Sequence, residues 1–193
     1  MNVKRALISV SDKEGIADFS KELSKLDINI ISTGGTASVL QKSNVPIIEI
    51  SKVTNFPEML DGRVKTLHPK VHGGILAKRE NKEHMDTLEK HGIDTIDLLV
   101  CNLYPFEKTI KKEKVGIDEV IENIDIGGPT LIRSAAKNYK DVIVVTDKNQ
   151  YKNVIETLKN KGDLDVSERE KLAIDAYTHT AQYDTIISNK KKK

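Results

Sequence analysis

The stretch ALISVSDKEGIADFSKELSKL, residues 6–26, decides the fold class, because a short apolar run passes within a few residues into a helical pattern. Residues 6–10 are aliphatic apart from Ser9, and two of them are β-branched, as in a buried strand. Ser11 or Asp12 can act as the N-cap of a following helix. Apolar side chains then recur at helical spacing, at Ile16, Phe19, Leu23 and Leu26. The stretch therefore predicts a strand followed directly by a helix.

The same alternation continues along the chain. Further strands are expected over residues 28–32, 45–50, 97–101 and 141–146. Helices are expected over residues 36–42, 83–91, 106–112, 117–123, 148–161 and 167–187, with another opened by Gly127-Gly128-Pro129. Between them, Gly34-Gly35 reads as a turn and residues 51–75 as a long loop. This order predicts an α/β fold with three layers, α/β/α, around a mostly parallel sheet with right-handed crossovers.

The composition is that of one globular domain with little net charge. The chain has 193 residues, with 31 Lys and Arg against 29 Asp and Glu, and its formal net charge is only +2. Aromatic residues make up 4% and Trp is absent, so a surface for stacking nucleic-acid bases is not expected. The lysine run 190–193 could touch nucleic acid or an anionic membrane, or it could be a solvated, frayed end. We expect residues 1–189 to form the domain and residues 190–193 to be a disordered tail.

Cysteine content and hydropathy point to the cytoplasm. The single Cys101 excludes an intrachain disulfide and fits a reducing compartment. No stretch approaches ~20 apolar residues, and the N-terminus lacks the pattern of a signal peptide. We therefore expect a cytoplasmic protein whose partner is neither nucleic acid nor a membrane.

Two strand-to-helix turns carry the residue types that bind phosphate. They are Ser11-Asp12-Lys13 and Thr33-Gly34-Gly35-Thr36, and both follow strands whose carboxyl ends should share one edge of the sheet. Hydroxyls, a lysine and a close backbone approach at a helix N-terminus suit a phosphate monoester. Neither turn matches the Walker or G-x-G-x-x-G pattern. The alternative is that these residues only cap helices and turn the chain.

The long loop adds two cations within a few residues. Arg63 can clamp an anion with its fork of donors, and Lys65 can act as a point donor or an acid. A solvated loop is the alternative. His68 and His72 have the spacing of zinc ligands, but the H-E-x-x-H glutamate is missing and a lysine intervenes, so no metal is expected.

A third group of residues surrounds the helix opened by Gly127. Asp125 precedes N–H groups at a helix start, which can stabilise an oxyanion or simply form a cap. Near the end of the same helix, Lys137 follows two alanines, so that its stem could be partly buried and its pKa lowered, or it could be an ordinary favourable charge. Cys101 lies in an apolar strand and is expected to be a core residue rather than a nucleophile.

In order along the chain, these motifs resemble the IMP cyclohydrolase domain of the bifunctional purine biosynthesis protein, which also carries phosphoribosylaminoimidazolecarboxamide formyltransferase activity. The resemblance covers the whole chain apart from the lysine tail, and the central motif is highly specific. The matching residues are 9–13, 33–37, 56–69, 101–106, 124–128 and 178–184. The resemblance implies a methylglyoxal-synthase-like, Rossmann-like domain that closes the purine ring of 5-formamidoimidazole-4-carboxamide ribonucleotide to give inosine monophosphate and water. No cofactor or metal is implied.

The resemblance also implies roles for individual residues. Lys137 would donate or accept a proton, and Lys65, Tyr104 and Asp125 would assist. Lys65 and the backbone near Asp125 and Ile126 would act on the developing oxyanion. The residues implied to bind the substrate, mostly around its phosphate and base, are Ser11, Asp12, Lys13, Thr33, Gly34, Gly35, Thr36, Arg63, Val64, Thr66, Cys101, Asn102 and Ile126.

Other functions remain compatible with these residues. The first alternative is a non-catalytic allosteric domain of the same fold that binds a phosphorylated metabolite, and the second is methylglyoxal synthase. Family members carry a C-terminal formyltransferase domain that these 193 residues do not contain, so we expect either a truncated chain or a free-standing enzyme. A homodimer is also compatible with the family.

Overall fold

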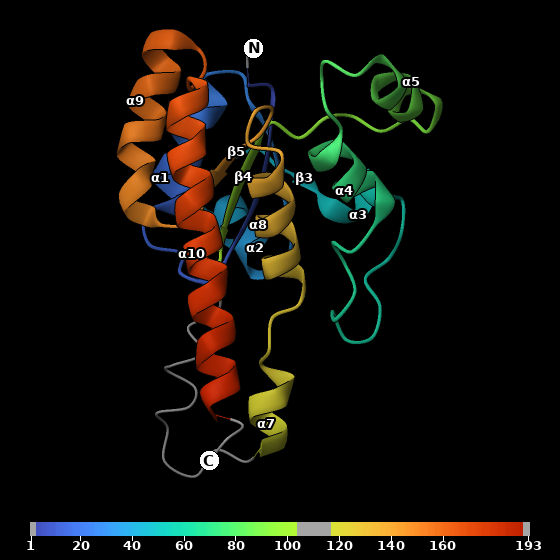
Figure 1. Cartoon of the computed structure of the whole chain (residues 1–193), viewed down its shortest axis with the longest axis vertical. Helices are drawn as coiled ribbons and strands as arrows, with labels where there is room; N and C mark the ends of the chain where they lie inside the picture. The colour runs from blue at the N-terminus through green and yellow to red at the C-terminus, as the bar shows by residue number, and fades with distance from the viewer. Residues whose placement is uncertain (1–2, 104–116, 191–193) are drawn as a thin grey trace.

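The computed structural model describes residues 3–103 and 117–190, and these form a parallel sheet between two layers of helices (Figure 1). The strands are β1 (Arg5–Val10), β2 (Asn29–Ser32), β3 (Ile48–Glu49), β4 (Leu98–Asn102) and β5 (Ile143–Val145). Their order is β3-β2-β1-β4-β5, and every neighbouring pair is parallel. The predicted α/β/α class and parallel sheet are confirmed.

The helices alternate with the strands along most of the chain. Among the described residues they are α1 (Ile16–Lys25), α2 (Gly34–Lys42), α3 (Ile50–Thr54), α4 (Pro69–Leu76), α5 (Lys82–Lys90), α7 (Ile117–Glu122), α8 (Gly127–Lys137), the 3₁₀ helix η1 (Lys148–Gln150), α9 (Tyr151–Lys161) and α10 (Val166–Lys190). Within this part of the chain, no helix is both long enough and apolar enough to cross a membrane.

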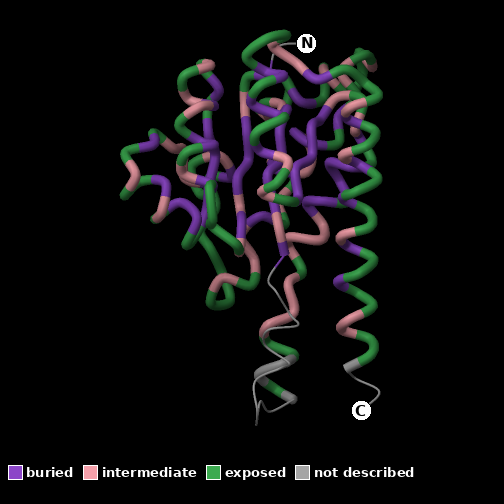
Figure 2. The backbone as a smooth tube through the Cα atoms, turned by 90° about the vertical axis from the view of Figure 1, so that its left-hand side faces the viewer, coloured by how far each residue is buried: buried purple, intermediate pink, exposed green. Residues whose placement is uncertain are grey.

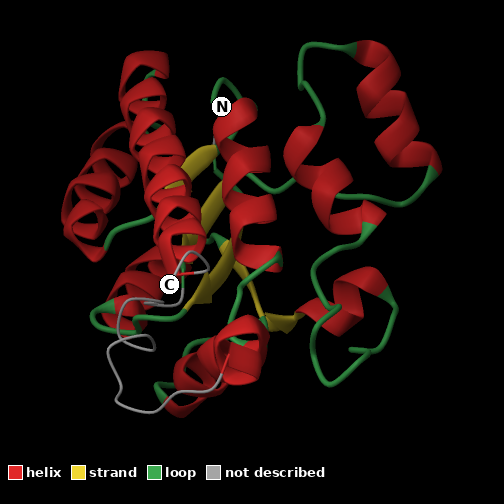
Figure 3. Ribbon diagram, turned by 60° about the horizontal axis from the view of Figure 1, so that its bottom comes forward, coloured by secondary structure: helices red, strands yellow, loops and turns green. Residues whose placement is uncertain are grey.

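The two faces of the sheet are buried against different helices. Successive strand residues point to opposite faces, so Ile8 of β1 packs with α1 and α9, whereas Leu7 packs with α4, α8 and α10. Figure 2 shows this buried interior running through the middle of the molecule, and Figure 3 shows the strands between the helices. Because both faces are covered, the strands are almost continuously apolar.

The strand order creates a switch point at the centre of the sheet. From β1 the chain moves outward through β2 to β3, and it then returns to β4 on the other side of β1. Val10 and Asn102 are register partners, so β1 and β4 end at the same level. The connections that leave these two strands diverge, and such a divergence leaves a crevice at the carboxyl edge of a parallel sheet.

The structure corrects several expected boundaries. Helix α2 begins at Gly34, so the two glycines form its first turn rather than a separate turn. Strand β3 is limited to two residues, because the chain enters α3 at Ile50, and the loop expected over residues 51–75 contains α3 and α4. Strand β5 is shorter than expected, and the long C-terminal helix extends to Lys190. The helix expected over residues 106–112 lies outside the described residues.

Helix α4 approaches the segment before β4 very closely at Gly74. A Cβ atom built at Gly74 would lie 2.6 Å from the backbone oxygen of Asp94, a distance that requires the backbone to move. The Gly74 carbonyl also accepts a hydrogen bond of 2.9 Å from the N–H of Ile96. At the neighbouring Gly73, the closest atoms to such a Cβ are side-chain carbons of Leu88 and Ile93 at 3.5 Å, an ordinary contact.

We predict opposite effects of alanine at these two glycines. Gly74→Ala should lower the free energy of unfolding by about 1–3 kcal/mol, because the backbone contact has to open. Gly73→Ala should be neutral or stabilising by up to ~1 kcal/mol, because alanine favours the helix and space is available. Urea unfolding followed by circular dichroism measures both changes, and equal midpoints for the two variants would contradict the close approach at Gly74.

Candidate functional site

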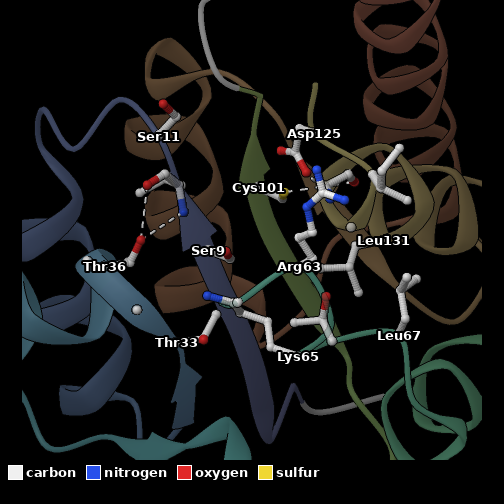
Figure 4. Close-up of a pocket in the computed structure, with 18 of the residues that line it drawn as sticks. Ser9, Ser11, Thr33, Thr36, Arg63, Lys65, Leu67, Cys101, Asp125 and Leu131 are labelled. Atoms are coloured by element: carbon white, nitrogen blue, oxygen red, sulfur yellow. Dashed lines mark hydrogen bonds between the residues drawn. The ribbon is translucent and has the colours of Figure 1, made fainter. Parts of the chain in front are cut away.

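A cleft lies at the carboxyl edge of the sheet, over the switch point between β1 and β4. Its volume is about 800 Å³. Four segments line it: the end of β1 with the turn that follows, the start of α2, the loop 61–67 and the residues from the end of α7 to the start of α8 (Figure 4). The end of β4 forms its floor. Fourteen of the residues expected from the sequence line it, namely Ser11, Lys13, Thr33, Gly34, Gly35, Thr36, Arg63, Val64, Lys65, Thr66, Cys101, Asn102, Asp125 and Ile126.

Asn102 joins the two central strands at the floor of the cleft. Its Oδ1 accepts hydrogen bonds from the N–H groups of Ser11 (2.7 Å) and Asp12 (2.9 Å), and its Nδ2 donates to the Asp12 carbonyl (3.1 Å). The amide therefore fixes the conformation of the turn after β1. The Asp12 carboxylate accepts from the N–H of Glu14 at 3.1 Å and pairs with Lys148 at 3.3 Å. Asp12 is thus beside the cleft and not among its lining residues.

Two lysines converge on the first turn of α2. A Cβ at Gly35 would lie 3.5 Å from Cε of Lys13, and a Cβ at Gly34 would lie 3.8 Å from Nζ of Lys65. Figure 4 shows Lys65 reaching toward Thr33 and this turn. Gly34 has a φ of +54°, which other residues adopt only with strain. The N–H groups of the helix start, its dipole and two ammonium groups thus lie at the same turn, where Lys13 also donates to the Ser11 carbonyl at 3.1 Å. This arrangement is suited to an anion.

Thr36 is committed to the fold. Its hydroxyl donates to the carbonyl of Val10 and accepts from the N–H of Val10, both at 3.0 Å. The side chain is buried and ties α2 to the end of β1. Thr36 can therefore contact a ligand through its backbone. The expected contact through its hydroxyl would require the loss of a buried hydrogen bond to Val10.

The loop 58–65 is a tight hairpin that presents both of its cations to the cleft. Met59 and Val64 form an antiparallel bridge, and Leu60, Asp61 and Gly62 between them all have positive φ. Lys65 pairs with Glu58 of the same hairpin at 3.0 Å.

Arg63 is paired with a carboxylate on the opposite wall of the cleft. Its Nε donates to Oε1 of Glu122 at 3.1 Å, and its Nη2 pairs with Oε2 of the same residue. This hydrogen-bonded pair raises the pKa of Arg63 and lowers the pKa of Glu122. Both side chains are largely exposed, so solvent and salt weaken the pair.

Asp125 lies just before α8, and hydrogen bonds restrain both its backbone and its side chain. Its Oδ1 accepts from the N–H of Gly128 at 2.8 Å. Burial raises the pKa of the Asp125 carboxyl, and the N–H groups of Gly128 and Gly127 oppose that rise. The backbone N–H of Asp125 donates to the hydroxyl of Tyr183 at 2.7 Å. The expected action of this N–H on an oxyanion is therefore not supported by the geometry, because the group already has an acceptor.

Cys101 is buried at the end of β4, as expected. Burial raises the pKa of its thiol far above the ordinary value, so the thiolate is disfavoured. Its Sγ lies 4.0 Å from the carbonyl oxygen of Gly128. The residue shapes the floor of the cleft, and its burial disfavours the nucleophilic thiolate.

The structure does not bring Lys137 to the cleft. Lys137 is the last residue of α8, whereas the cleft is bounded by the first residues of the same helix. Ten residues of helix separate the two ends by about 15 Å at ~1.5 Å per residue. Lys137 is exposed. Tyr104, the other expected catalytic residue, lies outside the described residues.

The two histidines with zinc-like spacing have structural contacts. Nδ1 of His68 accepts from the N–H of Lys70 at 3.1 Å and caps α4. Nδ1 of His72 lies 3.4 Å from the carbonyl oxygen of His68, and burial lowers the pKa of His72. Within residues 3–103 and 117–190, no group of three or more His, Cys, Asp or Glu side chains could hold a metal ion.

Sequence reasoning missed several residues of this site. Glu58 and Glu122 were not expected, because nothing in the local sequence pairs them with Lys65 and Arg63. Tyr183 and His179 belong to the segment 178–184 that carries part of the family resemblance, but no role was expected for them. Their contacts with residues 125 and 103 join positions that are 58 and 76 residues apart.

Comparisons with known proteins agree with the motifs. The family model for the MGS-like domain matches residues 15–130, and the model for the AICARFT/IMPCHase bienzyme matches residues 135–193. Three curated relatives bear the name "Bifunctional purine biosynthesis protein PurH". The chain is 56% identical to that of Acetivibrio thermocellus, 55% to that of a Thermoanaerobacter species and 54% to that of Ruminiclostridium cellulolyticum, in each case over 96% of its own length.

The chain spans only part of these relatives, but nearly all of one solved structure. It corresponds to 36–37% of the length of the three relatives. The solved structure titled "Crystal structure of ForH" superposes with a TM-score of 0.85 at 32% identity, covering 96% of this chain and 97% of the other. The chain therefore belongs to the MGS-like domain family, within which it corresponds to the IMP cyclohydrolase part of the bifunctional purine biosynthesis proteins.

Proposed function

We propose that this chain is an IMP cyclohydrolase, which closes the purine ring of 5-formamidoimidazole-4-carboxamide ribonucleotide and releases water. The observation that carries the proposal is the convergence of Lys13 and Lys65 on the glycine turn of α2, in the same cleft as the half-buried carboxylate of Asp125. This pairing provides an anion site beside a proton acceptor. A ribonucleotide with a phosphate at one end and a reacting amide at the other matches both.

The phosphate is placed at the first turn of α2. Lys13 supplies the charge, the glycines allow close approach of the backbone, and the helix N-terminus contributes its dipole. Lys65, which reaches the edge of this turn beside Gly34, is assigned to the reacting end of the substrate. Ser11 is presented at the same edge by the bonds of Asn102. Arg63 can reach an anionic substrate only after its pair with Glu122 opens.

Ring closure makes one carbon–nitrogen bond and expels one water. The carboxamide nitrogen attacks the formyl carbon, and the formyl oxygen takes up negative charge. The carboxamide nitrogen and the formamide nitrogen each lose one proton, and both protons leave with the formyl oxygen as water. Because both reacting groups are in one molecule, the protein has to fix their conformation and move protons.

Lys65 and Asp125 are the described residues suited to these steps. The ammonium group of Lys65 can stabilise the oxyanion and protonate the leaving oxygen. The carboxylate of Asp125 can accept the proton of the carboxamide nitrogen, and the rise of its pKa on burial makes it a better base than an exposed aspartate. Tyr104 stays an expected participant, and no step is assigned to Lys137.

Turnover distinguishes the enzyme from a sensor of the same fold. Lys65→Ala should lower kcat for formation of inosine monophosphate by about 100-fold or more, because one oxyanion donor contributes on that scale. The affinity for inosine monophosphate should fall by much less. Lys52→Ala, which removes an exposed lysine of α3, is the matched control. Wild-type protein that binds the nucleotide without any turnover would favour the allosteric alternative.

The acid limb of the pH–rate profile tests the role of Asp125. Protonation removes its ability to accept a proton, so kcat should fall as the pH is lowered through the pKa of Asp125 in the enzyme–substrate complex. Because burial raises this pKa, the limb should lie above the ordinary carboxyl value of 3.8. Asp125→Asn should lower kcat by about 100-fold and abolish the limb. Asp86→Asn on α5 should change neither, and an unchanged limb in Asp125→Asn would exclude Asp125 as the base.

Arg63 and Glu122 should have opposite effects on nucleotide binding. Arg63→Ala should weaken the binding of inosine monophosphate by about 10-fold, because it removes one charged contact. Glu122→Gln should tighten binding by a few-fold, because the nucleotide no longer competes with a carboxylate for Arg63. Both effects should shrink as salt is added. Calorimetry at two salt concentrations measures them, with Glu156→Gln on α9 as the control.

A further inference from the structure

The long helix α10 packs beside α8 on one face of the sheet and reaches the candidate site. His179 and Tyr183 are four residues apart, so their side chains lie on the same face of the helix, one turn from each other. Tyr183 is 5% exposed, and His179 is half-buried. Neither residue lines the cleft. Tyr183 bonds to the backbone of Asp125, which lines it, and His179 bonds to the backbone of Leu103, which directly follows a lining residue.

Tyr183 holds Asp125, the residue with the half-buried carboxylate. Its hydroxyl accepts a hydrogen bond of 2.7 Å from the N–H of Asp125. The carboxylate of the same residue accepts from the N–H of Gly128 at 2.8 Å. Asp125 is therefore held at its backbone by α10 and at its side chain by the start of α8, which leaves little freedom in the direction of the carboxylate.

His179 holds the chain where it leaves β4. Its Nε2 accepts from the N–H of Leu103 at 3.3 Å, directly after Asn102 at the floor of the cleft. A Cβ at Gly128 would lie 2.7 Å from Cδ2 of Leu103, so Leu103 in turn packs against the start of α8. The bond requires an unprotonated Nε2. Burial lowers the pKa of His179, against the opposing charge of Asp147, and so favours the neutral ring.

The packing of α10 does not depend on these two bonds. Toward its N-terminal end, Arg169 donates to the carbonyls of Leu164 (3.1 Å) and Lys140 (2.9 Å). Ala173 and Ala176 are buried against the core beside α8 and β5. The polar groups of His179 and Tyr183 lie instead where the helix meets the end of β4 and the segment before α8.

We propose that His179 and Tyr183 are positioning residues, which set the direction of the Asp125 carboxylate and the exit of the chain from β4 for the proposed ring closure. The kinetic consequence of this inference rests on the proposed function. Its structural consequence, a fixed geometry at residues 103 and 125, does not. The two residues touch neither the substrate nor the reacting atoms. They act by fixing Asp125 and the adjoining Leu103–Gly128 contact at one geometry.

The kinetic test compares two tyrosines of the same helix. Tyr183→Phe removes the hydroxyl and keeps the ring, and it should lower kcat by about 10- to 100-fold, because a small displacement of a reacting group costs that much. KM and the dissociation constant for inosine monophosphate should change by less than about three-fold. Tyr177→Phe is the matched control, because its ring lies on the surface under Arg133 and should leave kcat unchanged. Unchanged kcat in Tyr183→Phe, or an equal loss in Tyr177→Phe, overturns the proposal.

The histidine is tested by rescue. His179→Leu removes the acceptor and should lower kcat, whereas His179→Gln places an amide oxygen near the position of Nε2 and should restore most of it. A loss of equal size in both variants overturns the role of the acceptor.

Hydrogen exchange separates this inference from the proposed function. In the full chain, the N–H of Asp125 should exchange about 10-fold faster in Tyr183→Phe than in wild type, and the N–H of Leu103 should respond in the same way in His179→Leu. The N–H groups of the central strands should keep their rates in both variants. Wild-type protein without turnover refutes the proposed function, whereas unchanged exchange at residues 125 and 103 refutes the positioning role.

Discussion

The side chain of Asn102 connects the two halves of the sheet at the point where they diverge, and the site is built around this connection. One amide oxygen accepts from two successive N–H groups after β1, and the amide nitrogen returns a bond to the same turn. A parallel sheet cannot close this gap through its own ladder, because the strands have ended there. The side-chain amide satisfies the backbone groups at the gap and so allows a cleft to remain open above them. Both the α2 turn and the start of α8 are arranged around that opening.

Two cations of the cleft are paired with carboxylates in or beside it. Lys65 is paired with Glu58, and Arg63 with Glu122. The Arg63–Glu122 pair is largely exposed and the Lys65–Glu58 pair is partly exposed, so both contribute little to stability and an anion can replace the carboxylates at a modest cost. When an anionic ligand displaces the two carboxylates, the cations become free to bind it. The pocket can therefore attract an anion although the protein as a whole is nearly neutral. This exchange also means that the overall charge of +2 carries no information about the site.

Helix α10 gives the site its rigidity on the side away from the solvent. The hydroxyl of Tyr183 and the imidazole of His179 complete hydrogen bonds for backbone groups that belong to no strand or helix ladder. Satisfying such groups orders the segments that carry them. The helix therefore links the core to the cleft through two polar contacts, while Ala173, Ala176 and the ring of Tyr183 pack in the core.

The sequence alone determined the fold class and most of the lining of the cleft. Apolar runs alternating with helical periodicity predict a parallel sheet, and in such a sheet the residues after each strand necessarily meet at one edge, as Ser11, Gly34 and Asn102 do. Local patterns could not limit β3 to two residues or show the pairing of Arg63 with Glu122, because both depend on neighbours distant in the chain. They also could not show that α10 returns to hold Asp125. Periodicity reports which face of an element is buried, whereas the distance between two side chains depends on how the elements pack, and only the tertiary structure decides that.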